Sequence, residues 1–280
     1  MMFGVKIWIL LLPGIATILG IAGTGLYLFQ DKLIYFPRPY AKEDLTSFDS
    51  RGGVTLSFSA DHGEQVAFYV PSANALPDQI WCCFAGIGGQ ALAWEGFARR
   101  NAAEGRAFLF VEWPSYGASQ GKPRPATVRA STRGAAIALA DYLGMNADEL
   151  RPRFAVLGHS MGAAGALLAA EELGARRALL FSPYTSLRDM ALRQKGPLIG
   201  RLLRHDYDNR AALASLAARP GTRVTIFHGT ADELIPIEMA RELHERHPAT
   251  VRLIELPGAD HNNLFKPAEP YLAVELAEAP

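Results

Sequence analysis

The sequence is poor in cysteine and carries no excess charge of either sign. Its 280 residues include only two cysteines, Cys82 and Cys83, which are adjacent. Adjacent cysteines can pair only through a strained ring, and these two lack the suitably spaced histidines of a zinc site. We therefore expect two buried thiols, no disulfide framework and no metal. The 28 basic residues balance the 28 acidic ones, which leaves no electrostatic drive towards nucleic acid.

Internal repeats and low-complexity tracts are also missing, so nothing in the sequence marks a second globular domain. Hydrophobic residues make up 49% of the chain and charged residues 20%. This composition is typical of a globular protein, and the length is sufficient to bury a large core in one α/β domain.

One long apolar segment lies near the N-terminus. No charged residue occurs between Lys6 and Asp31, and residues 7–30 exceed the roughly 20 residues that a membrane-spanning helix needs. We predict an uncleaved single-pass anchor over residues 1–30, a lipid membrane as its partner, and one domain over residues 31–280. A secretory signal cleaved near Gly20-Ile21-Ala22 is the alternative. Basic residues flank the segment on both sides, so the side of the membrane on which the domain lies stays open.

Short apolar runs alternate with helix-like segments in the rest of the chain. Two of the runs, Thr55–Phe58 and Gln65–Val70, predict an antiparallel hairpin. Further strands are expected at Ile80–Phe84, Ala107–Val111, Phe154–Leu157, Ala178–Phe181, Val224–His228 and Val251–Leu256. Helices are expected at Trp94–Glu104, Thr127–Leu143, Gly162–Leu173, Pro236–Arg246 and Pro267–Glu278. This alternation predicts an α/β fold with a mostly parallel sheet and helices on both faces.

Ser160 occupies the centre of Gly158-His159-Ser160-Met161-Gly162, between an expected strand and an expected helix. This pattern at a strand-to-helix turn is typical of a nucleophile elbow, which holds a serine in a strained conformation. Gly158 and Gly162 have no Cβ, so the strand and the helix can approach closely. The alternative is a glycine-lined turn with an unreactive serine.

Two later strands are followed by an acid and a base. Asp232 follows Val224–His228, and His261 follows Val251–Leu256. A serine nucleophile needs a base that a third group orients, and serine, acid and histidine come in the order typical of one hydrolase architecture. The carboxyl ends of parallel strands gather at one edge, so Ser160, Asp232 and His261 are the candidate triad. Asp260 and Glu233 are the competing acids.

Such a site also needs donors for a developing oxyanion. The backbone N–H of Met161, directly after the nucleophile, is one candidate. The second is expected in the glycine-rich loop after Ile80–Phe84, at Ile87, with Gly88 as the alternative. These glycines lack the lysine of a phosphate-binding loop, and no cofactor is predicted.

With these residues in place, the chain resembles the α/β-hydrolases over roughly residues 31–280. It is most similar to a small, membrane-anchored, minimally lidded branch related to serine aminopeptidases and lysophospholipase-like proteins. The resemblance lies in Phe29–Pro37, in Tyr116–Pro123 and in Ser182–Leu187. The chain differs in having Ala85-Gly86 in place of His-Gly, and Pro114-Ser115 in place of Arg-Gly.

The resemblance implies a serine hydrolase that cleaves small-molecule or lipid esters or thioesters. About forty residues separate Ser182 from the strand at Val224, too few for a large cap. This segment interleaves basic and apolar side chains, at Arg193, Lys195, Leu198, Ile199, Arg201, Leu202, Leu203 and Arg204. It is expected either to lie on an anionic membrane or to form a packed helix with a solvated basic face. A peptidase or amidase and a non-catalytic binding protein stay open as alternatives.

Overall fold

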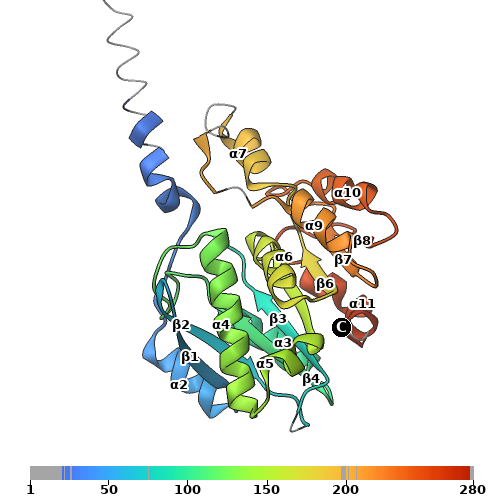
Figure 1. Ribbon diagram of the computed structural model, residues 1–280. Helices are drawn as coiled ribbons and strands as arrows, with labels where there is room; N and C mark the ends of the chain where they lie inside the picture. Colours follow the sequence, from blue (N-terminus) through green and yellow to red (C-terminus); the bar gives the residue numbers. More distant parts are fainter. Residues whose placement is uncertain are drawn as a thin grey trace, which may run out of the picture.

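The fold is built on an eight-stranded sheet, shown in the computed structural model of Figure 1. The structure describes residues 21, 23–25, 27–74, 76–196, 200, 202–205 and 207–277. The strand order is β1-β2-β4-β3-β5-β6-β7-β8. The strands are β1 (Val54–Ala60), β2 (Gly63–Val70), β3 (Gln79–Phe84), β4 (Arg106–Val111), β5 (Phe154–His159), β6 (Arg177–Phe181), β7 (Arg223–Gly229) and β8 (Val251–Leu256).

The pairing of the strands is antiparallel at one edge and parallel elsewhere. β1 pairs with β2, and β2 with β4, in antiparallel register. From β4 through β3, β5, β6 and β7 to β8 every pairing is parallel. The predicted hairpin and the mostly parallel sheet are thus confirmed. Because β3, β5, β7 and β8 are parallel, the segments that follow them meet at one edge of the sheet.

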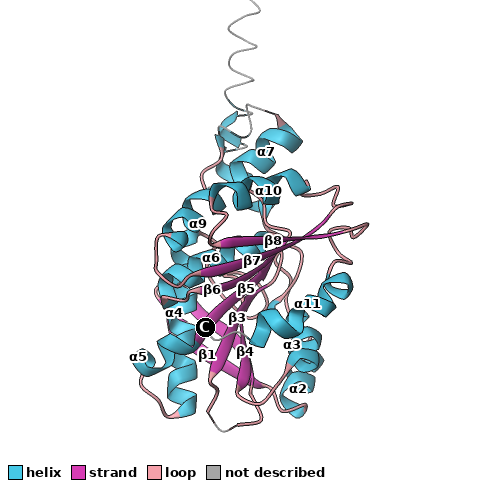
Figure 2. Cartoon of the chain, turned by 90° about the vertical axis from the view of Figure 1, so that its right-hand side faces the viewer, coloured by secondary structure: helices cyan, strands magenta, loops and turns pink. Residues whose placement is uncertain are grey.

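Helices cover both faces of the sheet (Figure 2). One side carries α4 (Pro125–Leu143), α6 (Met161–Leu173), α9 (Asn209–Ala217) and α10 (Ile237–Arg246), whose buried side chains share one core cluster. The other carries α2 (Lys42–Ser50), α3 (Glu95–Asn101) and α11 (Phe265–Ala277), which share a second cluster. Shorter elements are η1 (Ala91–Trp94), α5 (Ala147–Leu150), η2 (Arg151–Arg153) and α7 (Leu187–Lys195).

The two cysteines lie side by side in β3 and belong to opposite layers. Both are buried and free, and Cys82 belongs to the first cluster while Cys83 belongs to the second. Successive side chains of a strand point to opposite faces, which explains the split. Burial raises the pKa of both thiols above its usual range, so they are inert core residues.

Several helices differ from the sequence expectations in their boundaries. The segment expected at Trp94–Glu104 is a 3-10 turn followed by the shorter α3. α11 begins at Phe265, two residues before the expected start. Pro267 therefore lies in the first turn, where the missing N–H removes no intrahelical bond. The sequence did not predict α2, α5, α7 or α9. Their buried residues are few: Phe48 in α2, Leu150 in α5, Met190 in α7, and Asn209, Leu213 and Leu216 in α9.

Most of the anchor predicted over residues 1–30 lies outside the described residues. Its described part ends in a helical stretch at residues 27–34, which approaches α7 in Figure 1. Within the described part of the chain, no helix combines the length and the low polarity that crossing a bilayer requires.

Candidate functional site

The turn between β5 and α6 holds Ser160 in an unusual backbone conformation. Its φ is 57° and its ψ is −123°, values that a residue with a side chain rarely adopts. A Cβ on Gly158 would collide with the backbone of Gly162, and a Cβ on Gly162 would collide with the carbonyl of Phe84. Both glycines are therefore required for the close approach of strand and helix. The Ser160 N–H donates to the carbonyl of Phe181 at 2.8 Å, which ties the turn to β6.

Asp232 and His261 lie in contact at the same edge of the sheet. His261 Nδ1 donates to Asp232 Oδ2 at 2.8 Å. Asp232 Oδ1 accepts the N–H groups of Leu234 at 3.0 Å and Ile235 at 2.8 Å. Burial opposes ionisation of Asp232, but the hydrogen bonds from His261 and Ile235 outweigh it and hold the pKa of the carboxyl below its usual value. The carboxylate therefore orients the imidazole and leaves Nε2 as its free acceptor.

Ser160 and His261 share the wall of a cavity of about 430 Å³. No hydrogen bond joins the Ser160 hydroxyl to the His261 ring. Such bonds are often long in unliganded sites and shorten when substrate binds. The candidate nucleophile and the candidate base thus line the same cavity.

The two candidate oxyanion donors flank the serine. Met161 is the first residue of α6, where a backbone N–H has no intrahelical acceptor. Ile87 and Gly88 line the cavity with Ser160, and the Ile87 N–H donates to no described residue. A Cβ built on the neighbouring Gly86 would lie 3.4 Å from the Ser160 Cβ. The loop after β3 therefore passes directly over the side chain of Ser160.

The competing acids face elsewhere. The Asp260 carboxylate accepts the N–H groups of Asn262 at 2.8 Å and Asn263 at 2.9 Å, and so caps its own turn. The Glu233 side chain is exposed. Of the three candidate acids, Asp232 is the one whose carboxylate reaches the imidazole of His261.

Two further histidines belong to the site, although the sequence connected neither with a role there. His159 Nε2 lies 2.9 Å from the carbonyl of His261, and the two rings pack with centroids 4.7 Å apart. Burial, together with the neighbouring His261, lowers the pKa of His159 to about 4. His228 Nε2 lies 3.5 Å from Asp232 Oδ2. Each sits within one residue of a strand end, the signal that could have marked it.

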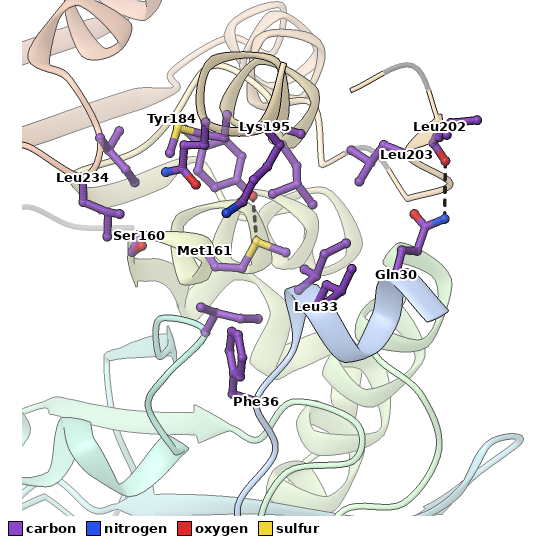
Figure 3. A pocket seen from close by; sticks show the side chains of 17 residues that line it. Gln30, Leu33, Phe36, Ser160, Met161, Tyr184, Lys195, Leu202, Leu203 and Leu234 are labelled. Atoms are coloured by element: carbon purple, nitrogen blue, oxygen red, sulfur yellow. Dashed lines mark hydrogen bonds between the residues drawn. The ribbon is translucent and has the colours of Figure 1, made fainter. Parts of the chain in front are cut away.

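A larger cavity of about 630 Å³ opens on the other side of Ser160 (Figure 3). Its walls come from Gln30, Leu33, Ile34 and Phe36, from α7, and from residues that follow β3, β5, β6 and β7. Apart from Gln30, Gln194 and Lys195, the lining is mainly apolar, at Leu33, Ile34, Phe36, Ile87, Met161, Tyr184, Leu187, Met190, Ala191, Leu202, Leu203, Leu234 and Ile235. The Tyr184 hydroxyl donates to Met161 Sδ at 2.8 Å, so the main polar group deep in the cavity is already satisfied.

Comparison by sequence finds relatives along almost the whole chain. No family model matches it. It is 26% identical over 285 residues to the uncharacterized protein YfhR of Salmonella typhi, an alignment that covers 94% of this chain and 87% of YfhR. It is 25% identical over 258 residues to the uncharacterized protein Rv2307c of Mycobacterium tuberculosis, covering 90% and 88% of the two chains.

Solved structures share the fold. The esterase Pf2001 of Pyrococcus furiosus aligns with a TM-score of 0.61 at 16% identity, over 87% of this chain and 95% of that one. The esterase Est2 of Thermogutta terrifontis, with propionate bound, aligns with a TM-score of 0.59 at 21% identity, over 81% and 96%. The chain therefore has the fold of the α/β-hydrolase superfamily, as its sequence predicted.

Proposed function

We propose that this protein is a serine hydrolase that cleaves carboxylic esters or thioesters with an apolar acyl group. The observation that carries the proposal is the 2.8 Å hydrogen bond between Asp232 Oδ2 and His261 Nδ1, at the edge where the strained Ser160 shares a cavity with His261. A serine, a histidine and a carboxylate so arranged form the constellation that activates a hydroxyl for acyl transfer.

In the proposed reaction, Ser160 Oγ attacks the carbonyl carbon of the substrate while His261 Nε2 takes the hydroxyl proton. The carbonyl oxygen becomes an oxyanion and accepts the N–H groups of Ile87 and Met161. The bond to the alcohol or thiol then breaks, and His261 returns the proton to that leaving group. Water, activated by the same histidine, attacks the acyl-enzyme and releases the acid. Asp232 stays ionised and stabilises the imidazolium.

The apolar lining of the 630 Å³ cavity supports an apolar acyl group. Ligand sites of this volume are usually apolar, with a few polar groups that fix orientation. Two solved structures of the T. terrifontis esterase carry propionate and butyrate. By analogy, an acyl chain of this protein's substrate lies along Met161 towards Leu33 and Leu202.

We further propose that residues 1–30 anchor the enzyme in a membrane. The segment 27–36 supports this idea because it carries exposed apolar side chains, two of which also line the cavity. Leu28, Phe29, Leu33 and Phe36 are each more than half exposed, and Leu33 and Phe36 also line the cavity. An apolar path of this kind lets a lipid ester pass from a bilayer to Ser160.

Labelling with a fluorophosphonate tests the serine mechanism. The unmodified protein is expected to be labelled, and Ser160→Ala is not; equal labelling of both excludes the mechanism. A panel that pairs acyl nitrophenyl esters, acyl thioesters and aminoacyl amides then separates ester and thioester hydrolysis from peptide or amide hydrolysis. Hydrolysis of the amides alone would favour the peptidase alternative.

A further inference from the structure

The peptide group between Gly86 and Ile87 is held by hydrogen bonds to its two neighbours. Trp113 Nε1 donates to the carbonyl of Ala85 at 2.9 Å. The Tyr116 hydroxyl donates to the carbonyl of Ile87 at 2.8 Å. These two carbonyls belong to the peptide groups directly before and after the one that carries the Ile87 N–H. Both ends of that peptide group are thereby fixed in direction.

The same peptide group is also bonded through its own oxygen. The Gly86 carbonyl accepts the N–H of Gly89 at 2.9 Å. A peptide group whose oxygen accepts a bond on one side points its N–H to the opposite side, and a hydrogen-bonded oxygen polarises the N–H for donation. Of the two polar groups of this peptide, only the Ile87 N–H lacks a described partner, and it can donate a hydrogen bond above Ser160.

The donors to this loop are themselves deeply buried. Trp113 and Tyr116 both have no measurable exposure. The Tyr116 hydroxyl also accepts the N–H of Phe36 at 2.8 Å, so it links two backbone groups by hydrogen bonds. The path runs from the Phe36 N–H through the Tyr116 hydroxyl to the Ile87 carbonyl.

Phe36 belongs to a connector, residues 36–40, that follows the helical stretch 27–34. The Arg38 carbonyl accepts the N–H of Gly117 at 2.8 Å and the side-chain amide of Gln90 at 3.0 Å. The Tyr40 hydroxyl donates to the Glu112 carboxylate, which accepts the Ala91 N–H at 3.1 Å. The connector is therefore bonded to the segment that carries Tyr116 and to the far end of the loop that carries Ile87.

From these contacts we infer that Tyr116 and Trp113 are positioning residues for the oxyanion donor Ile87, and that the connector holds Tyr116 in place. The inference rests on the proposed serine hydrolase function. Neither side chain contacts the reacting atoms; both act through the direction of the Ile87 N–H. The chain segment that joins the N-terminal region to the domain is thus part of the support of the oxyanion site.

The test compares Tyr116→Phe with Tyr35→Phe in the full-length protein. Each change removes one buried tyrosine hydroxyl. Tyr35 donates to the hydroxyl of Tyr207 at 3.1 Å and makes no bond to the loop, which makes it a matched control. The readouts are kcat and KM for an acyl nitrophenyl ester, and the inhibition constant of an acyl trifluoromethyl ketone, whose adduct with Ser160 places an oxyanion in the site.

Loss of a whole oxyanion donor lowers kcat about 10²–10³-fold, so misdirecting one is expected to cost about 10–100-fold. For Tyr116→Phe we expect that fall in kcat with KM within about threefold, and a parallel rise in the ketone inhibition constant. Tyr35→Phe is expected to keep both values. Trp113→Phe, which removes the other side-chain donor, serves as the second variant should Tyr116→Phe not fold.

The inference is overturned if a folded Tyr116→Phe or Trp113→Phe retains both kcat and ketone affinity, or if Tyr35→Phe loses them equally. These results leave the proposed function intact as long as the unmodified protein is labelled by a fluorophosphonate at Ser160. Absence of that labelling instead overturns the proposed function, and the inference with it.

Discussion

The imidazole of His228 lies directly behind the carboxylate of Asp232, with Nε2 3.5 Å from Oδ2. The same Nε2 is 2.8 Å from the carbonyl of Ile235. A carbonyl only accepts, so Nε2 carries the proton. Complete burial lowers the pKa of His228, which keeps the ring neutral. His228 thus closes the turn that presents Asp232 to His261.

Replacing His228 tests this support. His228→Leu removes the donor to the Ile235 carbonyl and loosens the turn, so kcat/KM for an ester substrate is expected to fall about 10-fold, the effect of losing roughly 1.4 kcal/mol. His228→Gln keeps an N–H donor and is expected to stay within about threefold of the parent. Equal activities of the two variants would show that the donor has no part in catalysis.

Asp232→Asn is expected to lower kcat by about 10⁴-fold with little change in fold, because an amide no longer holds His261 in the required tautomer. Asp260→Asn is the matched control. Its carboxylate caps the turn at Asn262 and Asn263 rather than facing the imidazole, so activity should stay within about threefold of the parent. Steady-state ester hydrolysis measures both variants. A larger loss of activity in Asp260→Asn would mean that Asp260, and not Asp232, is the acid that supports His261.

Glu112 predicts a pH dependence of stability. Burial, against the opposing hydrogen bonds from Tyr40, Ala91 and Trp113, raises its pKa from 4.5 to about 7. The folded state holds the proton of the Glu112 carboxyl more tightly than the unfolded state does. The protonated carboxyl therefore adds to the free energy of unfolding in full below pH 4.5, and this contribution is lost as the pH rises through 7. The loss amounts to about 3 kcal/mol.

Urea unfolding at pH 5 and pH 8 measures this contribution. Glu112→Gln cannot ionise, so its free energy of unfolding should change less between the two pH values than that of the parent. The exposed Glu149 supplies the control, and Glu149→Gln should keep the pH dependence of the parent. If Glu112→Gln kept the pH dependence of the parent, another group would be responsible for it.

Lys195 predicts a preference for anionic substrates. It is the one charged side chain among the described residues that line the 630 Å³ cavity, and Figure 3 shows it extending from α7 towards that cavity. It forms no ion pair with a described residue. For two acyl esters that differ only in a carboxylate or a neutral amide at the distal end, Lys195→Glu should lower kcat/KM for the anionic ester about 10-fold relative to the neutral one.

Arg193→Glu makes the same charge change on α7 at a residue that does not line the cavity, and it should leave the ratio of the two esters nearly unchanged. The preference in the parent should weaken as ionic strength rises, since exposed charges are screened by salt. A ratio that responds equally to both substitutions would indicate a general surface field rather than a contact of Lys195.

Local patterns predicted the strands better than the helices. The inner parallel strands are short, mainly apolar runs, because strands buried on both faces select such residues, whereas the edge strand β8 carries Arg252 and Glu255. α7 has Met190 as its only buried residue, and its other apolar side chains line the cavity beside Ser160 or are exposed. A helix that contributes so little to the core was not among those the sequence predicted. The strained backbone of Ser160 was likewise predictable from the sequence, since two flanking glycines are needed wherever a strand and a helix come so close.

The sequence by itself determined the α/β class, the strand positions and the order in which Ser160, Asp232 and His261 follow strands, because these depend on residue type and local spacing. Only the tertiary structure decided that Tyr116 bonds to Ile87, that His228 lies behind Asp232, and that Leu33 and Phe36 line the cavity beside Ser160. These are contacts between side chains and backbone groups brought together by packing of the sheet and its loops, and no local pattern records which partners packing will choose.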